Sequence, residues 1–295
     1  MEDYHDWSTH TYNIFRWNRF IKRSITKAEN KNLSVISITD HNNCDAYFEL
    51  ENLNVSDYFT GRIIAGIELN TKAEGVPIEI LGYNIDYKKM NELAKKTYLS
   101  PDKRNELEFE RLVNKCKESG MILDDDVIEK FDKKDFASVA IHKSITNHKE
   151  NKDKINERSW NSSRDFYRDY MSNPRTPLYV EMDDLVPDLD TAINLVKEAG
   201  GLVFIPHIYE YRDNTPKVLE YILKNGRLYG IECYYTTFTD EQHEYILNLT
   251  KEKCLFISGG SDYHGSRKPD TDLGVGHGNL KIPEKIQEPW AKYII

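Results

Sequence analysis

Apolar residues recur at four-residue intervals between positions 15 and 30, and the mainly apolar stretch Leu33-Ser-Val-Ile-Ser-Ile38 follows. The first pattern predicts an amphipathic helix, and the second predicts a buried strand. Similar short runs predict further strands over residues 62–69, 77–83, 201–205, 228–234 and 254–257. Helical patterns over 189–199, 216–224 and 240–251 separate the later strands. This alternation predicts an α/β fold with a largely parallel sheet or barrel.

The middle of the chain has a different pattern. Residues 94–183 show little strand signal, and four helical stretches are predicted there, at 104–119, 125–131, 140–149 and 162–171. We therefore expect two domains, an α/β domain formed by residues 1–93 and 184–295 and a helical insertion formed by residues 94–183. The insertion carries as many basic as acidic residues, so all of the net charge lies on the α/β part.

Composition narrows the possible functions. The formal charge of -9 argues against a general polyanion binder, because nonspecific nucleic-acid binding needs a basic face. The four cysteines, Cys44, Cys116, Cys233 and Cys254, form no close pair, so we expect them to be reduced and mostly buried. The polar start of the chain and the lack of a long apolar run predict a cytoplasmic protein with no membrane partner. No obligate protein partner is implied.

Residues able to bind metal follow the predicted strands. His41, Glu68, His207 and the pair Asp262 and His264 each stand at or just after the end of one strand. The carboxyl ends of the strands in a parallel α/β barrel converge on one mouth, so these side chains are expected to meet. One such residue alone is more often a capping or surface group. Four strand ends occupied in this way predict a metal site.

The same residues resemble the motifs of the PHP (polymerase and histidinol phosphatase) family of metal-dependent phosphoesterases. The resemblance spans nearly the whole chain and lies in Asp3-Tyr-His5-Asp-Trp7, Thr39-Asp40-His41, Gly66-Ile-Glu68, Ile205-Pro-His207 and Gly260-Ser-Asp262-Tyr-His264-Gly265. It implies a distorted (β/α)7-type, TIM-like barrel with a helical cap insertion. Gly230-Ile-Glu-Cys-Tyr-Tyr235 resembles a further family strand that is mainly scaffolding.

The resemblance also implies two or three divalent ions, drawn from Mn, Fe, Zn and Mg. Three metals would be held by three sets of residues: His5, Glu68 and Asp262; Glu68, His142 and His207; and His10, His41 and His264. His142 comes from the insertion, at a place that resembles a family helix start. Asp262, His264 and His207 are the expected catalytic residues. Asp40 is expected to orient a metal-bound imidazole or to cap its loop.

This sequence departs from the family pattern at several positions. Trp7 replaces the second histidine of the first motif, and an indole has no lone pair to offer a metal, so we place it beside the metals rather than among their ligands. Asp6 is a possible substitute, although strand alternation points it away from His5. Glu79 stands where some family members have a metal-binding histidine. The pattern favours reading Glu79 as an exposed edge-strand carboxylate, and a ligand role stays open.

The insertion resembles the cap of the subgroup that acts on nucleoside monophosphates and nucleotide 3',5'-bisphosphates. The predicted function is therefore hydrolysis of a phosphomonoester on a small substrate, a nucleotide above all. An exonuclease acting on short RNA or single-stranded DNA ends and a noncatalytic metal-binding regulatory module are the alternatives. Residues 143–175 include eight basic and five acidic residues. The candidate phosphate-binding residues are Lys143, Arg164, Arg168, Arg175 and Arg267.

Overall fold

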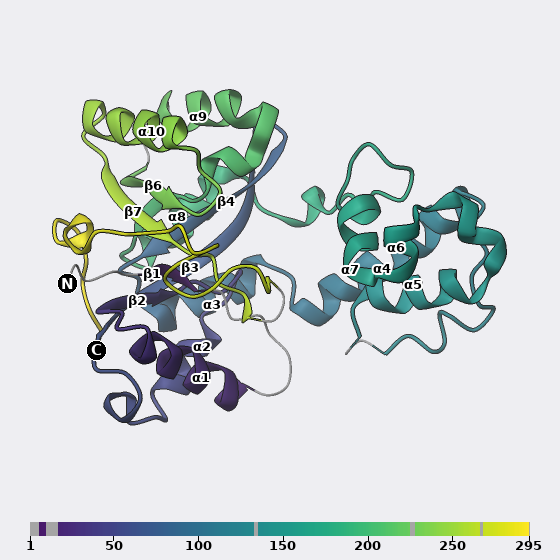
Figure 1. The fold of residues 1–295 in the computed structure, drawn as a ribbon, viewed down its shortest axis with the longest axis horizontal. Helices are drawn as coiled ribbons and strands as arrows, with labels where there is room; N and C mark the ends of the chain where they lie inside the picture. The colour runs from purple at the N-terminus through teal and green to yellow at the C-terminus, as the bar shows by residue number, and fades with distance from the viewer. Residues whose placement is uncertain (1–5, 10–16, 133–134, 225–227, 266–267, 295) are drawn as a thin grey trace. The chain divides into compact units, whose positions relative to one another are not determined.

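The structure is a computed structural model, and it describes residues 6–9, 17–132, 135–224, 228–265 and 268–294. The chain divides into two compact units (Figure 1). Unit 1 comprises Met1–Tyr98 and Val186–Ile295, and unit 2 comprises Leu99–Leu185. Each unit has its own hydrophobic core. Within the described residues, no helix has the length and apolar character needed to cross a membrane.

Unit 1 is built on a seven-stranded sheet whose spatial order follows the chain order. Its strands are β1 (Asp6–Thr9), β2 (Val35–Ile38), β3 (Arg62–Ala73), β4 (Val76–Tyr83), β5 (Leu202–Ile205), β6 (Gly230–Tyr235) and β7 (Phe256–Gly260). The first and last strands lie against each other, so the sheet is strongly curved. This mixed α/β arrangement is consistent with a TIM-like fold and confirms the predicted α/β class.

One strand runs against the others. β4 is antiparallel to both β3 and β5, whereas every other neighbouring pair in the sheet is parallel. Glu74 and Gly75 form the two-residue turn between β3 and β4, with φ angles of 52° and 76°. Positive φ at both central residues is the geometry that a tight hairpin needs. The pairing between β4 and β5 joins Leu81, Gly82 and Tyr83 to β5, whereas Glu79 lies earlier on β4, where it pairs with Asn70 of β3.

Helices pack on the outer face of the sheet. They are α1 (Trp17–Asn30), α2 (Asp45–Leu50), α3 (Tyr87–Thr97), α8 (Leu189–Glu198), α9 (Thr215–Lys224) and α10 (Asp240–Glu252). In Figure 1, α1 and α2 lie near β2, and α9 and α10 lie near β6. Three of these helices begin at side chains that accept backbone N–H groups, Asp86 for α3, Asp188 for α8 and Thr239 for α10. The main core lies between these helices and outward-facing residues such as Ile36, Ile63 and Ile67.

The inner face of the sheet changes from apolar to polar along its strands. Ile64 and Leu81 pack with Tyr83, Phe204 and Trp290 in a separate apolar cluster. Further along β2 and β3, the inner positions are occupied by polar side chains and by one glycine. A Cβ at Gly66 would lie 2.4 Å from the Ser37 Oγ and 2.8 Å from the Thr39 Cγ2, so only glycine fits between them. This polar layer leads directly to the carboxyl ends of the parallel strands.

The described residues of unit 2 form helices joined by turns and irregular segments, and they contain no strand. Its main elements are α4 (Pro101–Glu118), α5 (Ala137–Asn147), α6 (Glu157–Asn161), α7 (Ser163–Phe166) and the π-helical segment η3 (Tyr167–Met171). Phe109, Leu112, Ile141 and Phe166 are among the residues of its core. The predicted helix over residues 125–131 is wrong, because the chain forms turns there. Asp124 accepts a hydrogen bond from the Asn147 amide at 2.9 Å and joins this segment to the end of α5.

Short 3-10 segments complete the chain. They are η1 (Val55–Asp57), η2 (Lys149–Lys154), η4 (Asp183–Leu185), η5 (Ile208–Asn214) and η7 (Glu284–Gln287). The segment η5 follows β5 and begins directly after His207, so it lies where the predicted metal-binding residues meet. Among the cysteines, Cys44, Cys116 and Cys233 are buried, Cys254 is exposed, and all four are free.

Candidate metal centre

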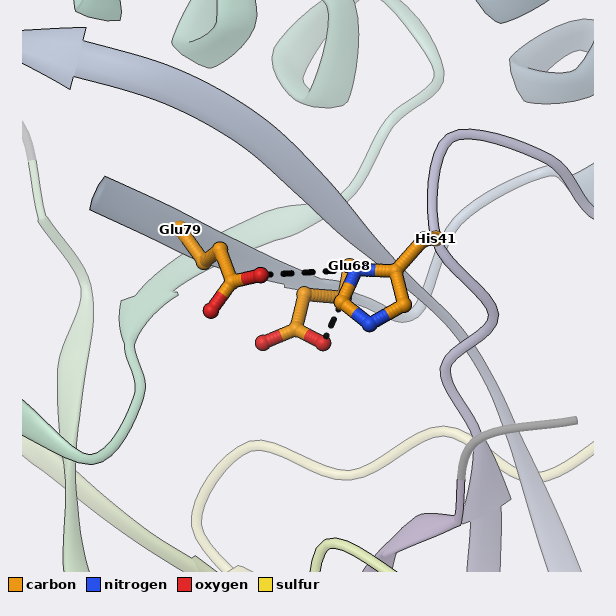
Figure 2. A group of neighbouring side chains, drawn as sticks. All are labelled: His41, Glu68 and Glu79. Atoms are coloured by element: carbon orange, nitrogen blue, oxygen red, sulfur yellow. Dashed lines mark ion pairs between the residues drawn. The ribbon is translucent and has the colours of Figure 1, made fainter. Parts of the chain in front are cut away.

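His41, Glu68 and Glu79 bring their ligand atoms together on β3, β4 and the loop after β2 (Figure 2). These atoms all lie within 4.8 Å of one another. The His41 Nδ1 is 3.5 Å from the Glu68 Oε2 and 3.5 Å from the Glu79 Oε1. Glu68 pairs with Leu81 and Asn70 pairs with Glu79, so both glutamates share one face of the β3–β4 hairpin as diagonal neighbours.

His207 approaches the same two carboxylates from β5. Its Nε2 is 3.2 Å from the Glu68 Oε1 and 3.3 Å from the Glu79 Oε2. In each glutamate, therefore, one oxygen faces His41 and the other faces His207. Two carboxylates that each join two imidazoles form a compact set of oxygen and nitrogen donors.

Burial and charge together set the protonation of His207. Burial lowers the pKa of its imidazole, but the hydrogen bond with Glu68 and the negative charges of Glu79, Glu68 and Asp262 outweigh that effect and raise the pKa to about 10. The histidine is thus a cation in the metal-free protein near neutral pH. Metal binding through the Nε2 of this histidine would release its proton, because a ligating imidazole is neutral.

Asp262 and His264 lie just beyond the end of β7. The His264 Nδ1 is 3.2 Å from the Asp262 Oδ1 and 2.8 Å from the Asp262 backbone oxygen, which leaves Nε2 as the nitrogen directed to a ligand. The His264 and His41 ring centroids are 6.1 Å apart. Asp262 Oδ2 accepts a hydrogen bond from the Tyr235 hydroxyl at 2.9 Å and contacts the Lys268 amine. The predicted convergence of strand ends is therefore present in the geometry of five residues: His41, Glu68, His207, Asp262 and His264.

Backbone strain is concentrated at this centre. His207 and Asp262 have positive φ angles of 27° and 51°, a conformation that costs free energy in residues other than glycine. Arg212 in η5 has a φ of 51° and a ψ of -121°, which kinks this segment. Strained residues of this kind persist where the surrounding structure fixes them, and they are typical of functional sites.

Several predicted residues lie elsewhere. His5, His10 and Arg267 are outside the described residues. Asp6 and Trp7 both belong to β1, of which only the backbone is described. His142, Lys143, Arg164, Arg168 and Arg175 belong to unit 2. The His142 Nε2 lies 2.8 Å from the Ser159 carbonyl oxygen. Donation to that carbonyl leaves Nδ1 with a lone pair, the arrangement that metal-bound histidines commonly have.

Asp40 is buried at 2 % exposure, directly before His41. Its backbone oxygen accepts the Glu68 N–H at 3.2 Å, and the Asn42 N–H donates to the Glu68 carbonyl at 2.8 Å. The loop after β2 is thus tied to the middle of β3. This connection holds His41 and Glu68 beside each other.

Three further residues contribute to the centre and were not predicted from the sequence. Glu232 is 1 % exposed, and its Oε2 accepts the backbone N–H of His207 at 2.8 Å. Burial raises the pKa of Glu232 to about 8, although the charge of His207 and its backbone hydrogen bond oppose this rise. The Tyr211 hydroxyl accepts the backbone N–H of Glu79 at 2.9 Å. Tyr235 reaches Asp262, as described above.

The signal for Tyr235 was hidden by an irregular strand. Glu232 pairs with Ser258, but Tyr234 pairs with Gly259 and Tyr235 with Gly260, so the register shifts between Glu232 and Tyr234. Regular alternation would place Glu232 and Tyr235 on opposite faces. A bulge reverses that alternation and directs both side chains toward the site. Glu232 itself was recognisable as a charged residue within a buried strand.

The donor set fits a divalent metal ion. Imidazole nitrogens and carboxylate oxygens, with no thiolate among the described residues of the cluster, suit Mn, Fe, Zn or Mg. His207 Nδ1 is buried without a hydrogen-bond partner among the described residues, so its Nε2 carries its contacts with the two glutamates. The close approach of Glu68 and Glu79 also needs a positive charge between them, which a metal ion would supply.

Comparison with solved structures gives neighbours of similar fold. No known protein family matches the chain, and no curated protein matches it. A protein from Bifidobacterium adolescentis ATCC 15703, assigned without proof of activity as a metal-dependent phosphoesterase, superposes with a TM-score of 0.67 and 19 % identity. That superposition covers 97 % of this chain and 95 % of the neighbour.

An amidohydrolase from Chromobacterium violaceum, with bound sulfate and no metal, superposes with a TM-score of 0.65 and 16 % identity. The superposition covers 95 % of this chain and 92 % of that protein. Identities this low show a shared fold alone. The chain therefore has a fold that is also found in metal-dependent hydrolases.

Proposed function

We propose that this protein is a metal-dependent phosphoesterase that hydrolyses a phosphomonoester of a small substrate. The observation that carries the proposal is the arrangement of Glu68 and Glu79, each of which faces both His41 and His207 through its two oxygens. Asp262 and His264 stand beside this set. Divalent ions held there would neutralise phosphate oxygens and lower the pKa of a water molecule, so that hydroxide is accessible near neutral pH.

The side chains around the centre have distinct parts in this proposal. His41, Glu68, Glu79, His207, Asp262 and His264 hold the ions, and His5, His10 and His142 are the further ligands that the resemblance to the PHP family supplies. The Lys268 amine, which contacts Asp262, is placed to bind a phosphate oxygen once the carboxylate is engaged by metal. The Tyr235 hydroxyl orients Asp262 by donating to its Oδ2.

A nucleotide is the proposed substrate class. The support is the resemblance of the sequence to PHP proteins that act on nucleoside monophosphates and nucleotide bisphosphates. The residues that we propose for binding the phosphate groups are those named from the sequence: Lys143, Arg164, Arg168, Arg175 and Arg267.

Bound metal and turnover test the proposal directly. The purified protein is analysed for metal content, and a chelator-treated sample is assayed with Mn, Fe, Zn and Mg against a generic phosphomonoester, nucleoside mono- and bisphosphates, and short oligonucleotides. We expect a metal-dependent release of phosphate, highest with a nucleotide. Release of mononucleotides from oligonucleotides would favour the exonuclease alternative, and metal binding without any turnover would favour the noncatalytic module.

Variants at the end of β7 separate catalysis from folding. Asp262→Ala and His264→Ala are expected to abolish turnover and to leave the far-ultraviolet circular dichroism spectrum unchanged, because both residues lie in a loop. Glu220→Gln, an exposed carboxylate on α9, is the matched control and should retain full activity. Retained activity in both loop variants would contradict the assignment.

A further inference from the structure

Glu232 is buried in the inner polar layer of unit 1. Its side chain is 1 % exposed, its Oε2 accepts the His207 N–H, and its Oε1 has no hydrogen-bond partner among the described residues. Burial of a carboxylate with incomplete hydrogen bonding weakens a fold, and an apolar side chain would avoid that cost. We therefore look for the role of Glu232 in its hydrogen bond to the backbone N–H of His207.

The φ of 27° and ψ of 49° of His207 place its backbone in the left-handed region, which a residue with a side chain adopts only when its surroundings hold it there. This turn of the chain directs the His207 Nε2 toward Glu68 and Glu79, at 3.2 and 3.3 Å. Relaxation of the backbone would rotate the imidazole away from both carboxylates.

We propose that Glu232 is a positioning residue, whose Oε2 fixes the backbone of His207 so that the imidazole faces the metal centre. The proposal rests on the proposed function in one respect, that the centre binds metal. Glu232 acts as a hydrogen-bond acceptor for a backbone N–H, and this role does not require its negative charge. Glutamine keeps an acceptor oxygen at the same distance along the side chain, whereas alanine has none.

Ser258 provides a matched control within the same layer. It pairs with Glu232 in the register of β6 and β7, is fully buried, and likewise has an oxygen without a hydrogen-bond partner among the described residues. The His207 N–H donates to Glu232 and not to Ser258. Loss of its hydroxyl tests whether any change in the buried polar layer affects metal binding.

The dissociation constant for Mn is measured by competition with a chelating dye, which requires no turnover. The proteins are the wild type, Glu232→Ala, Glu232→Gln, Ser258→Ala, His207→Ala and the double variant Glu232→Ala/His207→Ala, each checked for folding by circular dichroism. We expect Glu232→Ala to weaken Mn binding by about 10- to 100-fold, the usual effect of removing a group that orients a ligand. Glu232→Gln and Ser258→Ala should bind Mn as the wild type does.

The double variant distinguishes positioning from a general structural effect. If Glu232 acts through His207, its removal should cause no further loss of Mn affinity once His207 is absent. An additive loss, wild-type affinity in Glu232→Ala, or equal weakening in Glu232→Gln or Ser258→Ala would overturn the inference. Tight Mn binding without hydrolysis of any phosphoester would overturn the proposed function alone, and absence of Mn binding in the wild type would overturn both.

Discussion

Glu79 offers a direct test of the donor set, because Glu79→Gln removes one negative charge and preserves the size of the side chain. Its oxygens are 3.5 Å from His41 Nδ1 and 3.3 Å from His207 Nε2. Two unit charges at 3.3 Å attract by about 5 kcal/mol when the effective dielectric constant is about 20. This value is an upper limit, since the side chain of Glu79 is 28 % exposed and water screens part of the attraction.

If about 2 kcal/mol of the attraction remains, the substitution should raise the dissociation constant for a cation between these groups by about 30-fold. The assay is competition between the protein and a chelating dye for Mn at constant ionic strength, with metal content measured in parallel. Glu220→Gln, which removes an exposed carboxylate on α9, provides the control for net charge.

A change in Mn affinity no larger in Glu79→Gln than in Glu220→Gln would refute the inclusion of Glu79 among the ligands. It would return this carboxylate to the role of a surface group, as its position in the sequence suggested. A reduced number of bound ions, rather than a weaker affinity alone, would show that Glu79 completes one particular metal site.

Three further outcomes follow from the geometry. Tyr235→Phe removes the hydroxyl that donates to Asp262 and should weaken Mn binding by about tenfold. Tyr234→Phe, at the next position of β6, where the ring packs against His243 of α10, should leave Mn binding unchanged, and equal effects of the two substitutions would contradict the register of β6. Gly66→Ala places a Cβ 2.4 Å from the Ser37 Oγ and should lower the free energy of unfolding by about 1–3 kcal/mol. The double variant Gly66→Ala/Ser37→Ala should recover part of this loss, and urea unfolding measures the stability of each variant. The pKa values of His207, about 10, and Glu232, about 8, are raised, so the folded metal-free protein holds these two protons more tightly than the unfolded chain does. This stabilisation is complete at low pH and is lost as pH rises through about 8 for Glu232 and about 10 for His207. The melting temperature of chelator-treated protein should therefore fall between about pH 6.5 and 10, and a rise over this interval would exclude the effect.

The sequence indicated most of the secondary structure of unit 1, because buried strands and amphipathic helices are encoded in local apolar periodicity. The prediction failed over residues 125–131, where side-chain contacts of Asp124 with the end of α5 accompany turns. The spacing of apolar residues within a segment does not reveal a side-chain contact with a residue more than twenty positions away. The same limitation affected β4, whose direction depends on the Glu74-Gly75 turn and on its pairing with both β3 and β5.

Within the candidate centre, the residue types at the strand ends are readable from the amino-acid sequence. His41, Glu68, His207, Asp262 and His264 were identifiable there, because a run of apolar residues followed by a ligand-type side chain is a local signal. The positions of Glu79 and Glu232 beside these residues depend on contacts between distant segments of the chain. Glu79 enters through a reversed strand, and Glu232 through a contact with the backbone of a residue 25 positions away. Both depend on strand pairing between distant segments, and strand pairing is settled by the packing of the whole sheet rather than by the residues of either strand alone.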